Sequence, residues 1–319
     1  MNARQLQSLR SSLPVFGNSI ADVSLLRDYC VAYGIDFDGH HDAVQYTVGT
    51  VHSGEYQLAV HHWQRDGAVS NLLLLHGYFD HTGLYGELID WALRRGCNVL
   101  SFDLPGHGLS SGEPAAISHF GEYSQAITDT LSLGLQGDLP QWVIAQSTGA
   151  AALIDFGRTA AAWPFSASVL LAPLVRPVSW SRVRLTQILL NRFLQRVPRV
   201  FTRNSTDSEF LARLRADPLQ SQSVSVRWVG ALRRWLDELT IADLGRGPAL
   251  VVQGDADKTV DWPYNLGVVE QLFPGSQIQM LAGARHHLAG ESEAIRSIYL
   301  AAVNDWLLAH GVPLLNAQQ

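Results

Sequence analysis

The sequence contains few cysteines and no long uninterrupted run of apolar residues. Its two cysteines, Cys30 and Cys97, are too few for a disulfide framework and form no CxxC metal motif. No stretch approaches the roughly 20 apolar residues that a membrane-spanning helix needs. The first residues also lack the basic and apolar regions of a secretory signal. These absences predict buried thiols in a reducing, cytoplasmic compartment.

Basic residues are the minority among the charged ones, with 23 Lys and Arg against 29 Asp and Glu and a net charge of −6. This balance argues against general nucleic-acid binding, which needs a basic face. The charge is uneven, because residues 176–245 hold twelve arginines against six acids. That segment therefore carries about +6 and the remainder about −12, which indicates a segment with a separate task.

With 319 residues, 47% of them hydrophobic, the chain can bury a sizeable core. Six short, nearly continuous apolar runs are typical of parallel strands covered on both faces. They are NLLLLHG from Asn71, CNVLSFD from Cys97, QWVIAQS from Gln141, ASVLLAP from Ala167, ALVVQGD from Ala249 and QIQMLAG from Gln277. Helix-like segments such as residues 84–96 separate them, and residues 45–63 read as two strands joined by a Ser-Gly turn. The alternation predicts an α/β fold with a mostly parallel, doubly wound sheet opened by an antiparallel hairpin.

One interval between predicted strands is about 75 residues long, whereas the others span roughly 25–45. Within it, residues 181–197 and 226–239 are rich in arginine and look like amphipathic helices. We therefore expect a helical cap at 176–245, inserted between core segments 41–175 and 246–319. Residues 1–40 are expected to form a helical or irregular N-terminal extension.

The stretch VIAQSTGAA places Ser147 between a predicted strand and a predicted helix. Chemistry in open α/β sheets collects at the carboxyl ends of strands. A nucleophile elbow reads small-x-Ser-x-small, because strand and helix pass closely there. Here Ala145 stands where glycine is usual and Gly149 fills the last position. These five residues alone fit an N-cap serine equally well.

A nucleophilic serine needs a base, an acid that orients the base, and donors for the oxyanion. Acidic residues follow the predicted strand at 249, and histidines follow the next strand. The acids are Asp255, Asp257 and Asp261, and the histidines are His286 and His287. The order Ser, Asp, His is the one that elbow sites of this kind use.

Further motifs appear in a fixed order along residues 70–290. They are HGxxxHxxxY at 76–85, DxxGHGxSxG at 103–112, DPL at 217–219, GxxD at 254–257 and GAxH at 283–286. On these motifs the sequence resembles α/β-hydrolases of the monoacylglycerol lipase and lysophospholipase type.

The resemblance implies the α/β-hydrolase fold and makes Ser147 the nucleophile. It selects Asp257 as the acid through GxxDxxV, with Asp255 as the alternative. It selects His286 as the base through GAxH, with His287 as a neighbour of the site.

The oxyanion hole is expected to use the backbone amides of Tyr78 and Thr148. The bulky Tyr78 stands where small relatives carry alanine, which leaves the acyl-chain length open.

The remaining histidines are not expected to act in catalysis. Three are expected to tie loops together by hydrogen bonds: His76, His81 and His107. The pairs His40-His41 and His61-His62 would chelate a metal poorly, because adjacent strand residues point to opposite faces. No phosphate-binding glycine-rich loop occurs. Neither a metal nor a cofactor is expected.

The implied activity is a serine hydrolase that cleaves carboxylic esters of amphiphiles, monoacylglycerols or lysophospholipids, through an acyl-enzyme on Ser147. A small-ester or thioester hydrolase, or a peptidase of the same fold, would use the same triad. A catalytically silent ligand-binding member is disfavoured by the complete set of Ser, Asp and His. Ser147 also disfavours the epoxide hydrolases and dehalogenases of this fold, which use an aspartate nucleophile.

The arginine-rich cap leaves three roles open: a solvated helix face, a guide for anionic or phosphate-bearing amphiphiles, or a peripheral membrane contact. In the last case Ile188, Leu189 and Phe193 would face the membrane or the acyl chain. The headgroup and the oligomeric state remain open.

Overall fold

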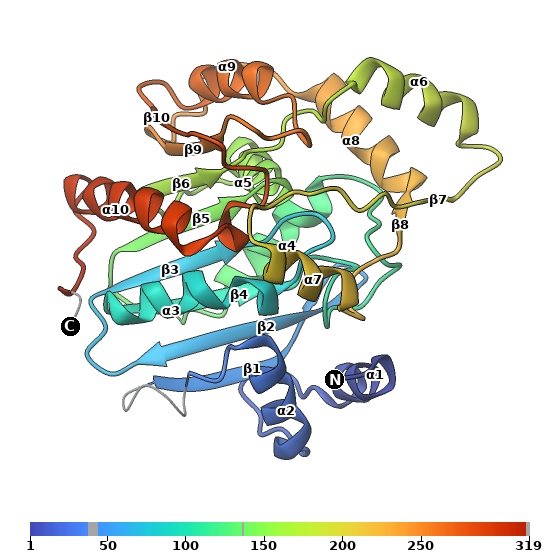
Figure 1. Ribbon diagram of the computed structural model, residues 1–319. Coiled ribbons are helices and arrows are strands. Elements are labelled where there is room, and N and C mark those ends of the chain that lie inside the picture. Colours follow the sequence, from blue (N-terminus) through green and yellow to red (C-terminus); the bar gives the residue numbers. More distant parts are fainter. Residues whose placement is uncertain (38–43, 136, 317–319) are drawn as a thin grey trace.

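The computed structural model describes residues 1–37, 44–135 and 137–316, and an eight-stranded sheet runs through its centre (Figure 1). The strand order is β1-β2-β4-β3-β5-β6-β9-β10. The strands are β1 Val44–Ser53, β2 Tyr56–Arg65, β3 Ser70–Leu75, β4 Cys97–Phe102, β5 Gln141–Gln146, β6 Ala167–Leu171, β9 Leu250–Gly254 and β10 Gln277–Leu281. Pairing is antiparallel at β1–β2 and β2–β4 and parallel elsewhere in this sheet. The predicted α/β fold with its antiparallel hairpin is confirmed.

Helices cover both faces of this sheet, which explains the unbroken apolar runs. Along β3, Leu72 and Leu74 pack into one core with α3 (Gly86–Arg94) and α10 (Glu293–Ala309). The alternate residues of β3 pack into a second core, because successive strand side chains point to opposite faces. That core includes side chains from α4 (Gly121–Leu131), α5 (Thr148–Thr159) and α9 (Trp262–Leu272).

The N-terminal residues form two helices, α1 (Ala3–Ser12) and α2 (Val23–Tyr33), which lie beside β1 (Figure 1). The chain between them pairs with the edge of the sheet, where the Phe16 amide donates to the Thr50 carbonyl at 3.0 Å. The predicted extension at 1–40 therefore contains helices over its described part.

The segment between β6 and β9, residues 176–245, is called the inserted segment below. It contains α6 (Trp180–Leu190), β7 (Arg196–Pro198), α7 (Ser208–Ala216), β8 (Ser223–Ser225) and α8 (Val226–Glu238), with β7 and β8 paired antiparallel. The helix predicted at 226–239 is confirmed, and its buried face includes Trp228 and Trp235.

The helix predicted at 181–197 is wrong in its extent, because α6 ends at Leu190 and the chain turns into β7. Its predicted amphipathic character is wrong too. Leu185, Ile188 and Leu189 of α6 are exposed, and Gln187 is the buried side chain among those described in this helix. None of the described helices combines the length and apolarity that a bilayer span requires.

Candidate active site

Ser147 occupies the sharp turn between β5 and α5, with φ of 52° and ψ of −111°. A positive φ is costly for a residue with a Cβ, so its surroundings must hold it in place. The Ser147 amide donates to the Leu171 carbonyl at the end of β6, at 2.9 Å. The turn thus presents the serine at the carboxyl ends of the strands.

The small residues of the elbow are required by close packing. A Cβ added at Gly149 would lie 2.5 Å from the Leu75 carbonyl oxygen. Ala145 is fully buried within β5, and its single methyl group fits into the second apolar core. The alanine that departs from the usual pattern is therefore compatible with the turn.

The structure brings Ser147, His286 and Asp257 together. The Ser147 Oγ lies 2.9 Å from Nε2 of His286, and the Nδ1 of His286 lies 2.8 Å from Oδ2 of Asp257. Oδ1 of Asp257 accepts the Thr259 amide at 2.7 Å, which fixes the carboxylate. The three side chains stand at the ends of β5, β9 and β10.

The pKa values of this pair move in opposite directions. Burial favours neutral His286, but the Asp257 carboxylate outweighs burial and raises the pKa of the imidazole. Burial likewise opposes ionisation of Asp257, yet His286 and its other hydrogen bonds lower the pKa of the carboxyl group. A carboxylate on Nδ1 favours the tautomer with a free lone pair on Nε2, which can accept the serine proton.

The competing acids and the second histidine have other partners. Oδ1 of Asp255 accepts the Gly283 amide at 2.7 Å, and Asp261 forms an ion pair with Arg176 at 2.6 Å. His287 accepts the Gly290 amide on Nδ1 at 3.0 Å. Among the described residues, none of the three is hydrogen-bonded to Ser147 or His286.

Tyr78 and Thr148, the predicted oxyanion residues, line one cavity together with Ser147. Thr148 is the first residue of α5, so its amide belongs to the helix end that lacks intrahelical acceptors. Tyr78 lies in the turn after β3, where the Asp80 amide donates to the Gly77 carbonyl at 3.1 Å.

Tyr85 and Asp80 support this turn, and neither was predicted from the sequence to belong to the site. The Gly77 amide donates to Oη of Tyr85 at 3.0 Å, and that hydroxyl donates to Oδ2 of buried Asp80 at 2.9 Å. Nε2 of His287 lies 3.1 Å from the same Asp80 oxygen. The last position of the HGxxxHxxxY motif is Tyr85, so the motif contained a signal for this support.

The cavity has a volume of about 320 Å³ and lies between the catalytic loops and the inserted segment. Most of its lining is apolar, as suits a hydrocarbon chain. The inserted segment contributes Val183, Val200, Phe201, Leu214, Val224, Trp228, Val229 and Leu232, and the surrounding loops contribute Tyr78, Phe79, Leu174 and Val260.

The histidines of the HG and GHG motifs tie loops together, as expected. Nε2 of His76 accepts the Leu104 amide at 2.9 Å. Nδ1 of His107 lies 2.9 Å from the Pro105 carbonyl, and burial lowers the pKa of His107 to about 3. Both imidazoles are structural parts of the loops around the site.

The paired histidines do not gather ligands in the described part of the chain. Nδ1 of His61 lies 2.7 Å from Oη of Tyr46, and burial lowers the pKa of His62 to about 4. His40 and His41 lie outside the described residues. Among the residues that the structure describes, no group of three or more His, Cys, Asp or Glu could hold a metal ion.

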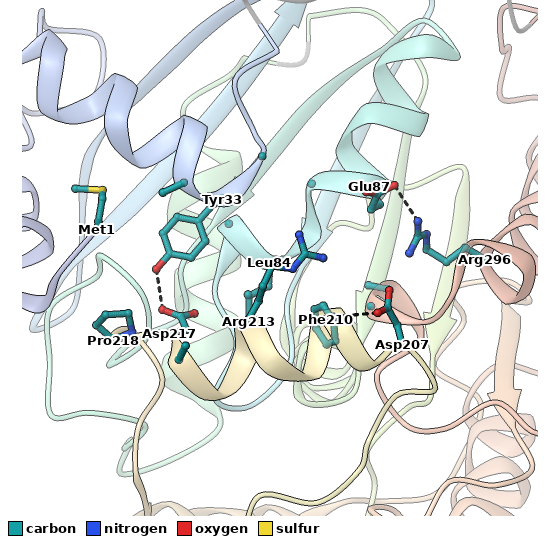
Figure 2. A pocket seen from close by; sticks show the side chains of 17 residues that line it. Met1, Tyr33, Leu84, Glu87, Asp207, Phe210, Arg213, Asp217, Pro218 and Arg296 are labelled. Atoms are coloured by element: carbon teal, nitrogen blue, oxygen red, sulfur yellow. Dashed lines mark hydrogen bonds and ion pairs between the residues drawn. The ribbon is translucent and has the colours of Figure 1, made fainter.

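A second cavity, of about 270 Å³, lies between α2, α7 and the 3-10 turn at Thr82–Tyr85 (Figure 2). Oη of Tyr33 donates to Asp217 at 2.7 Å, and the second oxygen of Asp217 lies 2.8 Å from Nε2 of His81. Neither Ser147 nor His286 lines this cavity. It is therefore separate from the catalytic cavity.

The fold, the elbow and the Ser-His-Asp geometry define a serine hydrolase of the α/β-hydrolase class. The family described as serine aminopeptidase, S33, matches residues 66–293, and the chain belongs to that family.

Relatives place it more closely within this class. The chain is 28% identical to mouse monoglyceride lipase over 278 residues, which cover 80% of this chain and 87% of the relative. It is 23% identical to phospholipase YtpA of Bacillus subtilis over 219 residues, 62% of this chain and 80% of the relative. A soluble variant of yeast monoglyceride lipase, solved with a substrate analogue, superposes with a TM-score of 0.70 at 18% identity, over 83% of this chain and 94% of that one. The relatives that the chain resembles at this modest identity are thus lipases and a phospholipase, which hydrolyse esters.

Proposed function

We propose that this enzyme hydrolyses carboxylic esters of single-chain amphiphiles, with Ser147 as nucleophile, His286 as general base and Asp257 as the acid that orients it. The observation that carries the proposal is the hydrogen-bonded series Ser147–His286–Asp257 on the wall of an apolar cavity. The names of the relatives, monoglyceride lipase and phospholipase, support the same substrate class.

In the proposed mechanism, Ser147 attacks the ester carbonyl while Nε2 of His286 takes its proton. The amides of Tyr78 and Thr148 stabilise the oxyanion, where one such donor contributes about 3 kcal/mol. His286 then protonates the leaving alcohol. A water molecule activated by the same histidine releases the acid from Ser147. Asp257 holds the imidazole in the required tautomer, and no cofactor takes part.

We further propose that the inserted segment is the cap of a core made of residues 41–175 and 246–319. Support comes from the cavity, since the inserted segment provides much of its apolar wall. Ile188, Leu189 and Phe193 do not line the cavity, and Phe193 is 81% exposed. Their exposure favours contact with a membrane or lipid aggregate over contact with a bound acyl chain. Two buried thiols that form no disulfide are consistent with a reducing compartment.

The first test is fatty-acid release from monoacylglycerols and lysophosphatidylcholine of short, medium and long chain. We expect release that Ser147→Ala lowers by roughly 10⁴-fold or more. Ser132→Ala, at an exposed serine, is the matched control and should leave turnover unchanged. Normal turnover by Ser147→Ala would contradict the assignment. Labelling of Ser147 by a fluorophosphonate without lipid hydrolysis would keep the triad and exclude the lipid substrate.

The family description keeps one alternative in view, an aminopeptidase that uses the same triad. Such an enzyme must bind the positive N-terminus of a peptide, for which a carboxylate is the natural partner. No Asp or Glu is among the described residues that line the cavity. Aminoacyl p-nitroanilides should therefore be poor substrates, and their rapid hydrolysis would favour the peptidase.

A further inference from the structure

The catalytic cavity contains two cationic side chains, Arg199 and Lys258, and no carboxylate among its described lining residues. Lys258 is the single lysine of the whole sequence. A pocket for a neutral ester of glycerol needs neither cation. The positive charge of the cavity therefore favours a substrate that carries a negative charge.

Arg199 is held firmly, yet it forms no ion pair with any acid among the described residues. Its guanidinium lies 3.9 Å from the ring centroid of Phe79 and 4.3 Å from that of Phe201. Nη1 donates to Oε1 of Gln220 at 2.7 Å and to the Ser221 carbonyl at 3.3 Å. Within the described chain Nε and Nη2 have no partner, so donors remain for a ligand.

Three other arginines of the inserted segment form ion pairs that Arg199 lacks. Arg196 and Arg227 pair with Glu113 at 2.8 and 3.4 Å, and Arg184 lies 3.7 Å from Asp237. These ion pairs are on the surface, whereas Arg199 lies against the catalytic cavity and forms no ion pair with the described residues.

Two acids influence the pKa of Arg199 electrostatically, and both are already paired with other groups. Burial lowers the pKa of the Arg199 guanidinium to about 10, although the negative charges of Asp80 and Asp217 partly oppose this shift. Asp80 accepts from Tyr85 and lies beside His287, and Asp217 is bound by Tyr33 and His81. Arg199 thus stays charged at neutral pH without a carboxylate of its own.

Both cations line the same cavity as Ser147 and His286, and they are connected to other residues of the site along the chain. Lys258 directly follows Asp257, and Phe79, on which Arg199 stacks, directly follows Tyr78. A ligand charge held by them would lie close to the scissile ester.

On these grounds we propose that the preferred substrate is a lysophospholipid with a net anionic, phosphate-bearing headgroup that Arg199 and Lys258 bind. This inference rests on the proposed function and specifies its substrate. A guanidinium binds phosphate through two parallel, charge-assisted hydrogen bonds. A glycerol headgroup carries no negative charge, so it cannot form such a pair.

The test compares three lauroyl esters: monolauroylglycerol, lysophosphatidylcholine and lysophosphatidylglycerol. We expect the wild-type enzyme to have the highest kcat/KM for lysophosphatidylglycerol. Arg199→Gln should lower the ratio of its kcat/KM to that of monolauroylglycerol by about 10- to 100-fold. Lys258→Gln should lower the same ratio less, because the ammonium of Lys258 is exposed and well hydrated.

Arg203→Gln is the matched control, since this exposed arginine belongs to the same segment but does not line the cavity. It should leave the ratio unchanged, and circular dichroism should show each variant to be folded. Should Arg199→Gln fail to fold, Lys258→Gln decides with the same readout.

A ratio that stays constant in folded Arg199→Gln and in Lys258→Gln would overturn the inference. An equal fall for neutral and anionic esters would also overturn it and would assign the cations to the fatty-acid product. Failure of the proposed function is distinct, because then none of the three esters is hydrolysed in a manner that depends on Ser147.

Discussion

At the scale of single residues, the site depends on polar groups that are distant in sequence and adjacent in space. Ser147 and His286 are 139 residues apart, and His286 and Asp257 are 29 residues apart, yet each pair is within hydrogen-bond distance. The Asp257 carboxylate reverses the effect of burial on His286, so the base keeps a raised pKa inside the protein. This coupling has a measurable consequence for the pH dependence of activity.

The value of kcat/KM should fall as pH decreases through the pKa of His286, because only the neutral imidazole accepts the serine proton. Since that pKa is raised above the ordinary value of 6.5, we expect the half-maximal point above pH 6.5. Asp257→Asn should move the point to lower pH and reduce activity by roughly 10⁴-fold.

Hydrolysis of p-nitrophenyl butyrate between pH 5 and 9 measures both effects. Asp255→Asn serves as the control, because Asp255 is not hydrogen-bonded to His286. An inflection below pH 6.5 in the wild-type enzyme, or one that Asp257→Asn leaves in place, would contradict this account.

At the scale of elements, Tyr78 connects the turn after β3 to the inserted segment by ring stacking and a hydrogen bond. The Tyr78 ring stacks on Trp228 of α8 with centroids 3.9 Å apart, and its hydroxyl donates to the Ala115 carbonyl at 2.8 Å. The Ser225 amide donates to the same hydroxyl at 3.4 Å. One side chain therefore joins the proposed oxyanion turn to β8 and α8 while it fills part of the cavity.

Tyr78→Ala should shift the preference of the enzyme toward longer acyl chains, because it removes a ring from the cavity wall. Each further methylene that fits is worth about 0.8 kcal/mol, or roughly fourfold in kcat/KM. We expect the ratio of laurate to butyrate p-nitrophenyl ester hydrolysis to rise by about tenfold or more.

Tyr78→Phe separates volume from hydrogen bonding, since it keeps the ring and removes the hydroxyl. Its chain-length ratio should equal that of the wild type. If the laurate-to-butyrate ratio changed in Tyr78→Phe and stayed constant in Tyr78→Ala, the Tyr78 ring would not limit the length of the acyl chain.

At the scale of the whole molecule, one carboxylate connects three distant parts. Asp217, at the end of α7, accepts from Tyr33 of α2 (Figure 2). Its second oxygen pairs with His81 in the loop after β3. The N-terminal helices, the core and the inserted segment thus meet at one buried group.

Tyr33→Phe should reduce the free energy of unfolding by about 1–2 kcal/mol, because it removes a hydrogen bond to a charged, buried carboxylate. The melting temperature measured by differential scanning calorimetry should fall by a few degrees. Tyr264→Phe is the matched control, as the Tyr264 hydroxyl has no hydrogen-bond partner among the described residues. Equal melting temperatures for Tyr33→Phe and the wild type would assign Tyr33 no stabilising role.

The amino-acid sequence by itself determined the strands and the residues that meet at their ends. Unbroken apolar runs such as that of β3 are local signals for buried parallel strands, and the elbow needs small residues close to Ser147. Because parallel strands end at one edge of a sheet, the predicted strands alone implied that Ser147 would lie near the acids at 255–261 and the histidines at 286–287. The resemblance selected Asp257 and His286 among them.

Only the tertiary structure decided what lies within residues 176–245. The strand β7 interrupts the apparent helix at 181–197 because Val197 pairs with Val224, a contact that no local periodicity contains. Arg199 was one of twelve similar arginines until its neighbours were placed, since charge compensation depends on which acids lie nearby in space. Local patterns specify elements, but the partners of a charge and of an edge strand are set by long-range packing.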